Sequence, residues 1–307
     1  MTSSARSRQI FPFLSTHVNM EPPKVRETGL TVLFDKTSPD VKNVDIVFVH
    51  GLNGNPKDTW THENGFFWPW ELRNVLTKAR VMTFGYNASM DSDLTQNFVR
   101  IKGIAASLNG ALANRRITAE QLSRPVIFVA HSLGGLVSKA AAVAASKTEA
   151  SGANDIDKLY ASMRGFMFFG TPHAGSGVFS KLRVKILQKM AKAAFKEIPP
   201  KLESALQAGS DEVLDLSEDF RKISLYVDLK LVIASYYEQK ATLGLGDRVV
   251  DEFSAAIAYA KANDLMPINA DHINMVKFKD EEDGEYDDVK GLLLRWETRL
   301  TEQGQHV

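Results

Sequence analysis

The sequence predicts a doubly wound α/β fold, with a mostly parallel sheet and one helical insertion. Short β-rich apolar runs alternate with helical stretches along most of the 307 residues, which is the order typical of βαβ units. The runs are almost continuously apolar, as expected for strands that helices cover on both faces. Hydrophobic residues make up 44% of the chain, enough for a large core.

The expected strands are residues 30–34, 44–49, 81–84, 126–130, 166–169 and 229–237. The expected helices are residues 70–78, 91–113, 133–146 and 286–300. Asp45 is the single interruption of its apolar run, and the helix at 133–146 is apolar nearly all round. Residues 178–222 break the alternation as a helical insertion divided by Pro199 and Pro200. We therefore expect a tail at 1–27 and one domain at 28–303, with the insertion as a lid.

Composition limits the classes of function. The chain has 37 basic and 37 acidic side chains, whereas a dedicated nucleic-acid-binding protein shows a basic excess. It has no cysteine, and it lacks the long apolar run of a membrane-spanning helix. An intracellular, cytoplasmic location is expected, with a mitochondrial one as the alternative because residues 1–20 contain Arg6 and Arg8 but no acid.

The segment PVIFVAHSLGGL, residues 125–136, predicts a nucleophilic serine at Ser132. A strand meets a helix at this serine, as in the G-x-S-x-G elbow, with Ala130 in place of the first glycine. The sharp turn needs small residues on either side, which Ala130 and Gly134 supply. The start of the helix also favours a developing oxyanion.

An oxyanion hole is expected from two backbone amides. The segment IVFVHGLNGN ends a strand in a glycine-rich loop, and such a loop supplies one amide while the residue after the nucleophile supplies the other. By position these residues are Leu52 and Leu133. We interpret His50 as a structural, hydrogen-bonding residue.

The general base is expected at His272. In hydrolases with this elbow the chain order is serine, acid, histidine, and His272 lies in a loop before the last helix. The acid should follow the strand at 229–237. Glu238 follows it directly, whereas Asp247 and Asp251 come later and remain alternatives.

Several segments in order resemble the serine-esterase and lipase branch of the α/β-hydrolases: VFVHGLNGNP, FWPWEL, VIFVAHSLGGLVSKAA, FFGTPHAGSG and NADHINMVKF. This branch includes the mitochondrial serine-active-site protein, GPI inositol-deacylase-like proteins and hydrolase domains of fungal repeat proteins. The resemblance covers roughly residues 28–300. It implies the α/β-hydrolase fold and ester hydrolysis without a cofactor or metal. It also favours Glu238, because the branch has an aromatic residue followed by Glu where this chain has Tyr237 and Glu238.

Other side chains are candidates for lining the substrate pocket: His131, His173, Trp60, Leu182 and Ile186. For Trp60 and His173 a place in the core or in a turn is the alternative interpretation. The insertion also carries a basic amphipathic stretch at 181–201, for which peripheral membrane contact is a second interpretation beside packing as a lid.

The sequence thus predicts a carboxylic-ester hydrolase that acts on a small-molecule or lipid ester through an acyl-enzyme on Ser132. An acyltransferase with the same triad and a non-catalytic receptor or binding module on this fold are the alternatives. The sequence predicts no oligomeric state.

Overall fold

The computed structural model describes residues 21–88, 97–149, 157–173, 215–225, 230–242, 246–250 and 263–302. Most of the predicted lid, including Leu182, Ile186 and the basic stretch at 181–201, lies outside the described residues. The same holds for residues 1–20 of the predicted tail.

A seven-stranded sheet forms the centre of the domain, in the order β1-β3-β2-β4-β5-β6-β7. Its strands are β1 (Gly29–Asp35), β2 (Val44–Val49), β3 (Ala79–Gly85), β4 (Val126–His131), β5 (Met163–Phe169), β6 (Val232–Glu238) and β7 (Asn263–Ile268). β1 runs antiparallel to β3, and all other neighbouring strands are parallel. The sequence did not locate β7, which holds Pro267; an edge strand tolerates proline because one side of it is unpaired.

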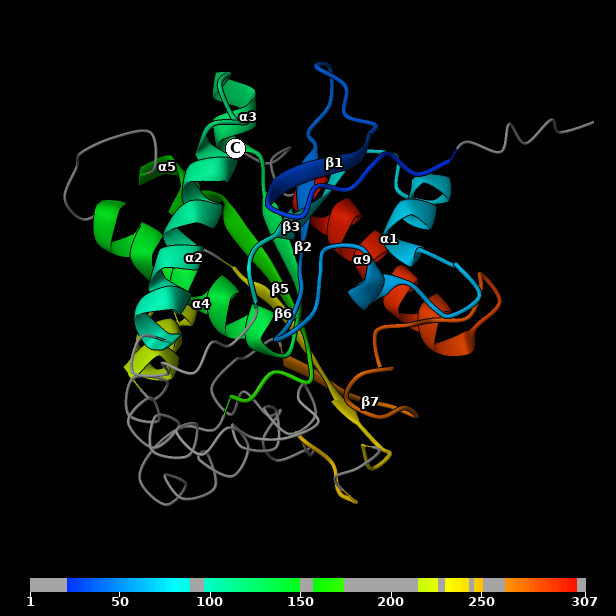
Figure 1. Ribbon diagram of the computed structural model, residues 1–307. Coiled ribbons are helices and arrows are strands. Elements are labelled where there is room, and N and C mark those ends of the chain that lie inside the picture. Colours follow the sequence, from blue (N-terminus) through cyan, green and yellow to red (C-terminus); the bar gives the residue numbers. More distant parts are fainter. Residues whose placement is uncertain are drawn as a thin grey trace, which may run out of the picture.

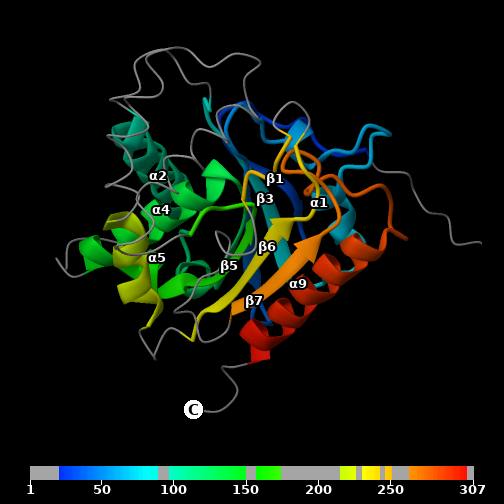
Figure 2. The same cartoon turned by 90° about the horizontal axis from the view of Figure 1, so that it is seen from below.

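Helices cover both faces of this sheet, as Figures 1 and 2 show. One face carries α2 (Asn97–Ala113), α4 (Leu133–Glu149) and α5 (Asp157–Ser162), and the other carries α1 (Trp68–Glu71) and α9 (Gly284–Glu302). A short α3 (Ala119–Ser123) precedes β4. The predicted helix at 70–78 is shorter than expected: α1 continues only as the 3-10 turn Leu72–Asn74. Because β3 already begins at Ala79, the residues after that turn lead into the strand.

Two hydrophobic cores result, one on each side of the sheet. The core below α2 and α4 contains Phe128, Phe166 and Phe168, together with Phe220 from the helical residues 215–224. The core below α1 and α9 contains Trp60, Trp68, Trp70 and Trp296. Trp68 is anchored there by a hydrogen bond of 2.9 Å from its Nε1 to the carbonyl of Val276.

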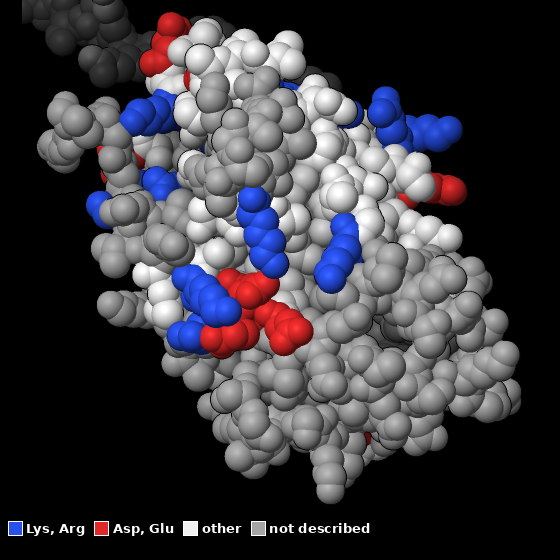
Figure 3. Space-filling view, turned by 90° about the vertical axis from the view of Figure 1, so that its left-hand side faces the viewer, with Lys and Arg blue, Asp and Glu red and all other residues white. Residues whose placement is uncertain are grey.

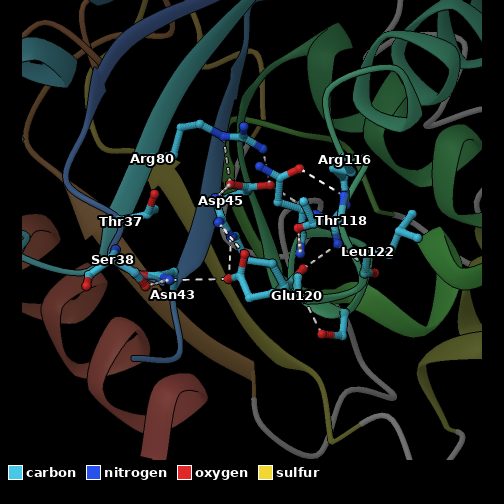
Figure 4. Close-up of polar contacts among 12 residues, drawn as sticks. Thr37, Ser38, Asn43, Asp45, Arg80, Arg116, Thr118, Glu120 and Leu122 are labelled. Atoms are coloured by element: carbon cyan, nitrogen blue, oxygen red, sulfur yellow. Dashed lines mark hydrogen bonds and ion pairs between the residues drawn. The ribbon is translucent and has the colours of Figure 1, made fainter. Parts of the chain in front are cut away.

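A buried cluster of charges explains the one polar residue in β2. The Asp45 carboxylate is fully buried and contacts three guanidinium groups, at 2.8 Å from Arg80, 3.0 Å from Arg116 and 3.2 Å from Arg124 (Figure 4). The three guanidinium groups carry more charge than Asp45 alone can balance. Glu120 supplies a second carboxylate, 2.7 Å from Arg124. Because an isolated buried charge is costly, Asp45 and its partners must fold together. The cluster lies at the beginning of β2, at the opposite end of the sheet from the carboxyl edge.

The described surface shows no large patch of a single charge on the face in Figure 3. Acidic and basic side chains lie next to one another on this face. Ion pairs of the described residues include Lys147–Asp219 and Arg221–Glu218. Across the described part of the chain, none of the helices has the length and apolar character needed to cross a membrane.

Candidate active site

Ser132 occupies a strained turn between β4 and α4. Its φ of 53° is in the left-handed region, which residues other than glycine rarely adopt and which often marks a functional site. A hydrogen bond of 2.8 Å from the Ser132 amide to the Phe169 carbonyl holds the turn against β5. A Cβ on Gly134 would lie only 2.2 Å from the Val49 carbonyl oxygen. The small residue predicted at this position is therefore required by the close approach of α4 to β2.

The elbow lies at the topological switch point of the sheet, where the strand order reverses. From β2 the chain passes to β3 on one side and then to β4 on the other. Such switch points leave a crevice at the carboxyl ends of the strands, where ligands bind in open α/β sheets. Gly51 follows β2 and Ser132 follows β4, and a Cβ on Gly51 would lie 2.9 Å from the Ser132 Cβ. The predicted oxyanion loop and the predicted nucleophile therefore meet at this crevice.

His272 lies within hydrogen-bonding distance of Ser132, the predicted nucleophile. Its Nε2 is 3.0 Å from Ser132 Oγ, although the two residues are 140 positions apart in the sequence. Gly170, with φ of 54°, makes room for the imidazole: a Cβ there would lie 2.9 Å from both Cε1 and Nδ1 of His272. The loop after β7 and the turn after β5 thus fix the ring together.

Glu238 is the acidic candidate that the structure places beside His272. It is the last residue of β6 and is fully buried, with Oε1 3.4 Å from His272 Nδ1. The same Oε1 accepts a hydrogen bond of 2.6 Å from the amide of Val250. Asp247 is exposed and its Oδ1 accepts a hydrogen bond from the amide of Arg248. Asp251 lies outside the described residues.

This arrangement favours one tautomer of His272. A carboxylate beside Nδ1 stabilises a proton on that nitrogen, which leaves the lone pair of Nε2 directed at Ser132 Oγ. In this tautomer the imidazole accepts the hydroxyl proton, as a general base must.

His50 forms hydrogen bonds within and beside the predicted oxyanion loop. His50 Nδ1 is 3.0 Å from the Gly51 carbonyl, and Nε2 accepts a 3.4 Å hydrogen bond from the Tyr86 amide. The Tyr86 hydroxyl donates in return to the His50 carbonyl at 2.5 Å, and the two rings stack. Burial lowers the pKa of His50 to about 4, so the ring is neutral and donates from Nδ1. Leu52 and Leu133, the predicted oxyanion donors, are partly buried beside Gly51 and Ser132.

The predicted pocket-lining residues occupy different places. Trp60 is fully buried and packs edge-on against Phe48 and Trp68, so it belongs to the core below α1 and α9 and not to a pocket wall. His173 is also buried, edge-on against Phe168 with Nε2 3.4 Å from Ser235 Oγ. His131 lies beside His272.

One residue near the site had no predicted role. Lys139, two turns after Ser132 on α4, is fully buried with Nζ 5.7 Å from the ring centre of Phe168 and 5.6 Å from that of Phe220. Within the described residues Nζ has no hydrogen-bond partner, and burial lowers its pKa to about 7. The sequence feature that could have drawn attention to Lys139 is its position as the one charged residue in the stretch 133–146, whose other residues are small or apolar. No set of His, Asp and Glu side chains in the described chain is grouped so as to hold a metal ion.

The parallel sheet, the serine elbow at its switch point and the histidine beside it define an α/β-hydrolase. The chain belongs to the family described as "Putative serine esterase (DUF676)", whose model matches residues 42–199.

Curated relatives are similar over most of this chain. Protein SERAC1 of Bos taurus is 26% identical over 281 residues, which cover 80% of this chain and 37% of the relative. Protein SERAC1 of Homo sapiens is 25% identical over the same shares. The chain therefore spans little more than a third of these relatives. Among solved structures, an inhibited esterase B from Lactobacillus rhamnosis has a TM-score of 0.47 at 16% identity, covering 89% of this chain and 82% of that one.

Proposed function

We propose that the protein hydrolyses a carboxylic ester through an acyl-enzyme on Ser132. The observation that carries the proposal is the 3.0 Å contact between Ser132 Oγ and His272 Nε2 at a strained strand-to-helix turn. A serine hydroxyl is a weak nucleophile until an adjacent base accepts its proton. The pairing of a serine in this conformation with such a base supports covalent catalysis.

The reaction follows from the positions of the groups. Ser132 Oγ attacks the acyl carbon while His272 Nε2 accepts the hydroxyl proton, and the amides of Leu52 and Leu133 stabilise the oxyanion. The His272 imidazolium then gives the proton to the departing alcohol, which leaves the acyl group on Ser132. A water molecule, deprotonated by His272, releases the carboxylic acid and restores the serine. Glu238 stabilises the imidazolium in both steps.

Two measurements test the proposal. A fluorophosphonate should label the wild-type protein, with the adduct located by mass spectrometry on the peptide that contains Ser132. Ser132→Ala should abolish both the labelling and the hydrolysis of p-nitrophenyl esters. Ser146→Ala is the matched control, because Ser146 lies on the same helix and its hydroxyl donates to the Val143 carbonyl at 2.9 Å.

Full esterase activity in Ser132→Ala would refute the proposal, as would a wild-type protein that neither reacts with the probe nor cleaves any ester. Product analysis with an added alcohol separates hydrolysis from acyl transfer, since transfer yields a new ester in place of the free acid.

A further inference from the structure

His131, the residue before the nucleophile, makes a contact with the loop that carries the base. It is the last residue of β4, and its side chain is buried. Its Nε2 lies 2.8 Å from the backbone carbonyl oxygen of His272. The two imidazole rings are 5.1 Å apart and tilted by 41°. The nucleophile and the base are therefore joined through a neighbouring side chain as well as by their own contact.

The direction of this hydrogen bond is fixed by chemistry. A carbonyl oxygen only accepts, so His131 must donate from Nε2. Burial, reinforced by the nearby charge of His272, lowers the pKa of His131 to about 3. The ring is thus neutral at ordinary pH, and its single proton, on Nε2, is held in the hydrogen bond to the His272 carbonyl. His131 therefore acts on the site by holding the His272 loop in position, and not by transferring a proton.

Among the described residues, two further contacts hold His272 in place, one through its backbone and one through its ring. Its amide donates to Thr242 Oγ1 over 3.4 Å, and its ring nitrogen Nδ1 is 3.4 Å from Glu238. Both distances are long for hydrogen bonds. The 2.8 Å bond from His131 to the His272 carbonyl is shorter than both of these contacts.

His131 also touches the oxyanion loop. A Cβ on Gly51 would lie 3.2 Å from His131 Nδ1 and 3.0 Å from the His131 carbonyl oxygen. One imidazole is therefore packed against the oxyanion loop on one side and bonded to the base-bearing loop on the other. A displacement of His131 would alter both parts of the site at once.

We infer that His131 is a positioning residue, which sets the distance from His272 Nε2 to Ser132 Oγ by donating from its own Nε2 to the His272 carbonyl. The inference rests on the proposed serine-hydrolase function. It predicts that the reaction rate depends on a hydrogen-bond donor at the position of His131 Nε2, and not only on a side chain of the same volume.

Three variants test this inference. The amide nitrogen of Gln is the same number of bonds from Cα as Nε2 of His, so His131→Gln keeps the donor in place. The amide nitrogen of Asn corresponds to Nδ1, so His131→Asn is polar but presents no donor to the carbonyl. His131→Leu fills the space and removes every donor. For each variant the rate of fluorophosphonate labelling of Ser132 is measured against pH, together with kcat, KM and the thermal midpoint.

We expect His131→Leu and His131→Asn to lower kcat and the labelling rate by about tenfold to a hundredfold, the usual effect of a lost buried hydrogen bond that positions a reacting group. KM should change by less than about threefold, because the substrate contacts are retained. His131→Gln should recover most of the rate.

Equal rates in folded His131→Leu and wild type would overturn the inference, and so would equal losses in Gln and Asn. If His131→Leu does not fold, the comparison of Gln with Asn decides alone. Failure of wild-type labelling would instead refute the proposed function, so the two outcomes remain distinct.

Discussion

Glu238 Oε1 lies 3.4 Å from His272 Nδ1 while it accepts a shorter hydrogen bond, 2.6 Å, from the Val250 amide. The contact of the carboxylate with the Val250 backbone is therefore shorter than its contact with the imidazole. Catalytic hydrogen bonds are often long in the absence of substrate and shorten as charge develops. In the proposed reaction, the Val250 amide would keep the carboxylate in place while His272 carries its positive charge.

Glu238→Gln should lower kcat by about a thousandfold or more, as the loss of a triad carboxylate does. The amide cannot stabilise the imidazolium, and it favours the wrong tautomer of His272. Asp247→Asn is the matched control, since Asp247 is exposed, and it should retain nearly full activity. Steady-state kinetics on one ester decide the matter; the opposite ranking would assign the acid to Asp247.

Gly170→Ala should impair both stability and catalysis. The left-handed φ of 54° costs a non-glycine residue about 1–2 kcal/mol, and the new Cβ would press on the His272 ring and on Met275 Sδ, each 2.9 Å away. A shift of the base by tenths of an ångström should reduce kcat by about tenfold or more. Gly246→Ala provides the comparison: its φ is 67°, but within the described part of the chain a Cβ there meets nothing within 4 Å. It should lose stability alone, and equal kcat values for the two variants would contradict the steric argument.

Lys139→Met should raise the thermal midpoint at pH 7. The pKa of Lys139 is lowered to about 7 from an ordinary 10.5, so between these values the unfolded chain binds a proton that the folded chain does not. Folding is therefore penalised increasingly as the pH falls from about 10.5 to 7, and the penalty is constant below that. The gain from Lys139→Met should be largest at pH 7 and should shrink toward pH 10. Melting curves across this range test it, with the exposed Lys147→Met as control; a gain independent of pH would rule out titration of Lys139 as the cause.

Asp45→Asn should destabilise the fold without changing the chemistry. Removing the carboxylate leaves three buried guanidinium groups with one fewer partner, and breaking a buried ion pair typically costs about 3–5 kcal/mol. Denaturant unfolding measures the loss. Asp287→Asn, which breaks the surface pair between the exposed Asp287 and the partly buried Lys290, should cost less than about 1 kcal/mol. Since Asp45 lies at the opposite end of the sheet from Ser132, the kcat of the folded Asp45→Asn variant should equal that of wild type.

The sequence predicted those parts of the fold that depend on local patterns. The buried parallel strands and the elbow at Ser132 are encoded by apolar runs and small residues close together in the chain. The strand β7 was not located, because Asn263, Asp264 and Pro267 hide its pattern, and pairing with β6 stabilises it all the same. The role of Asp45 was also beyond prediction, since its arginine partners are 35, 71 and 79 positions away in the sequence. The contacts of His131 and Trp60 depend on the tertiary arrangement in the same way, so spacing alone could not distinguish a pocket wall from a core residue.

The placement of the tryptophans decides what fluorescence can report about this molecule. All four, Trp60, Trp68, Trp70 and Trp296, belong to the core below α1 and α9. Intrinsic emission is therefore an optical probe of one side of the sheet, while far-ultraviolet circular dichroism is dominated by helices on both sides. Overlapping melting curves from the two signals would mean that both layers unfold together. A dichroic transition at a lower temperature than the fluorescence transition would indicate that the layer of α2 and α4 unfolds first. This layer contains α4, the helix that follows Ser132.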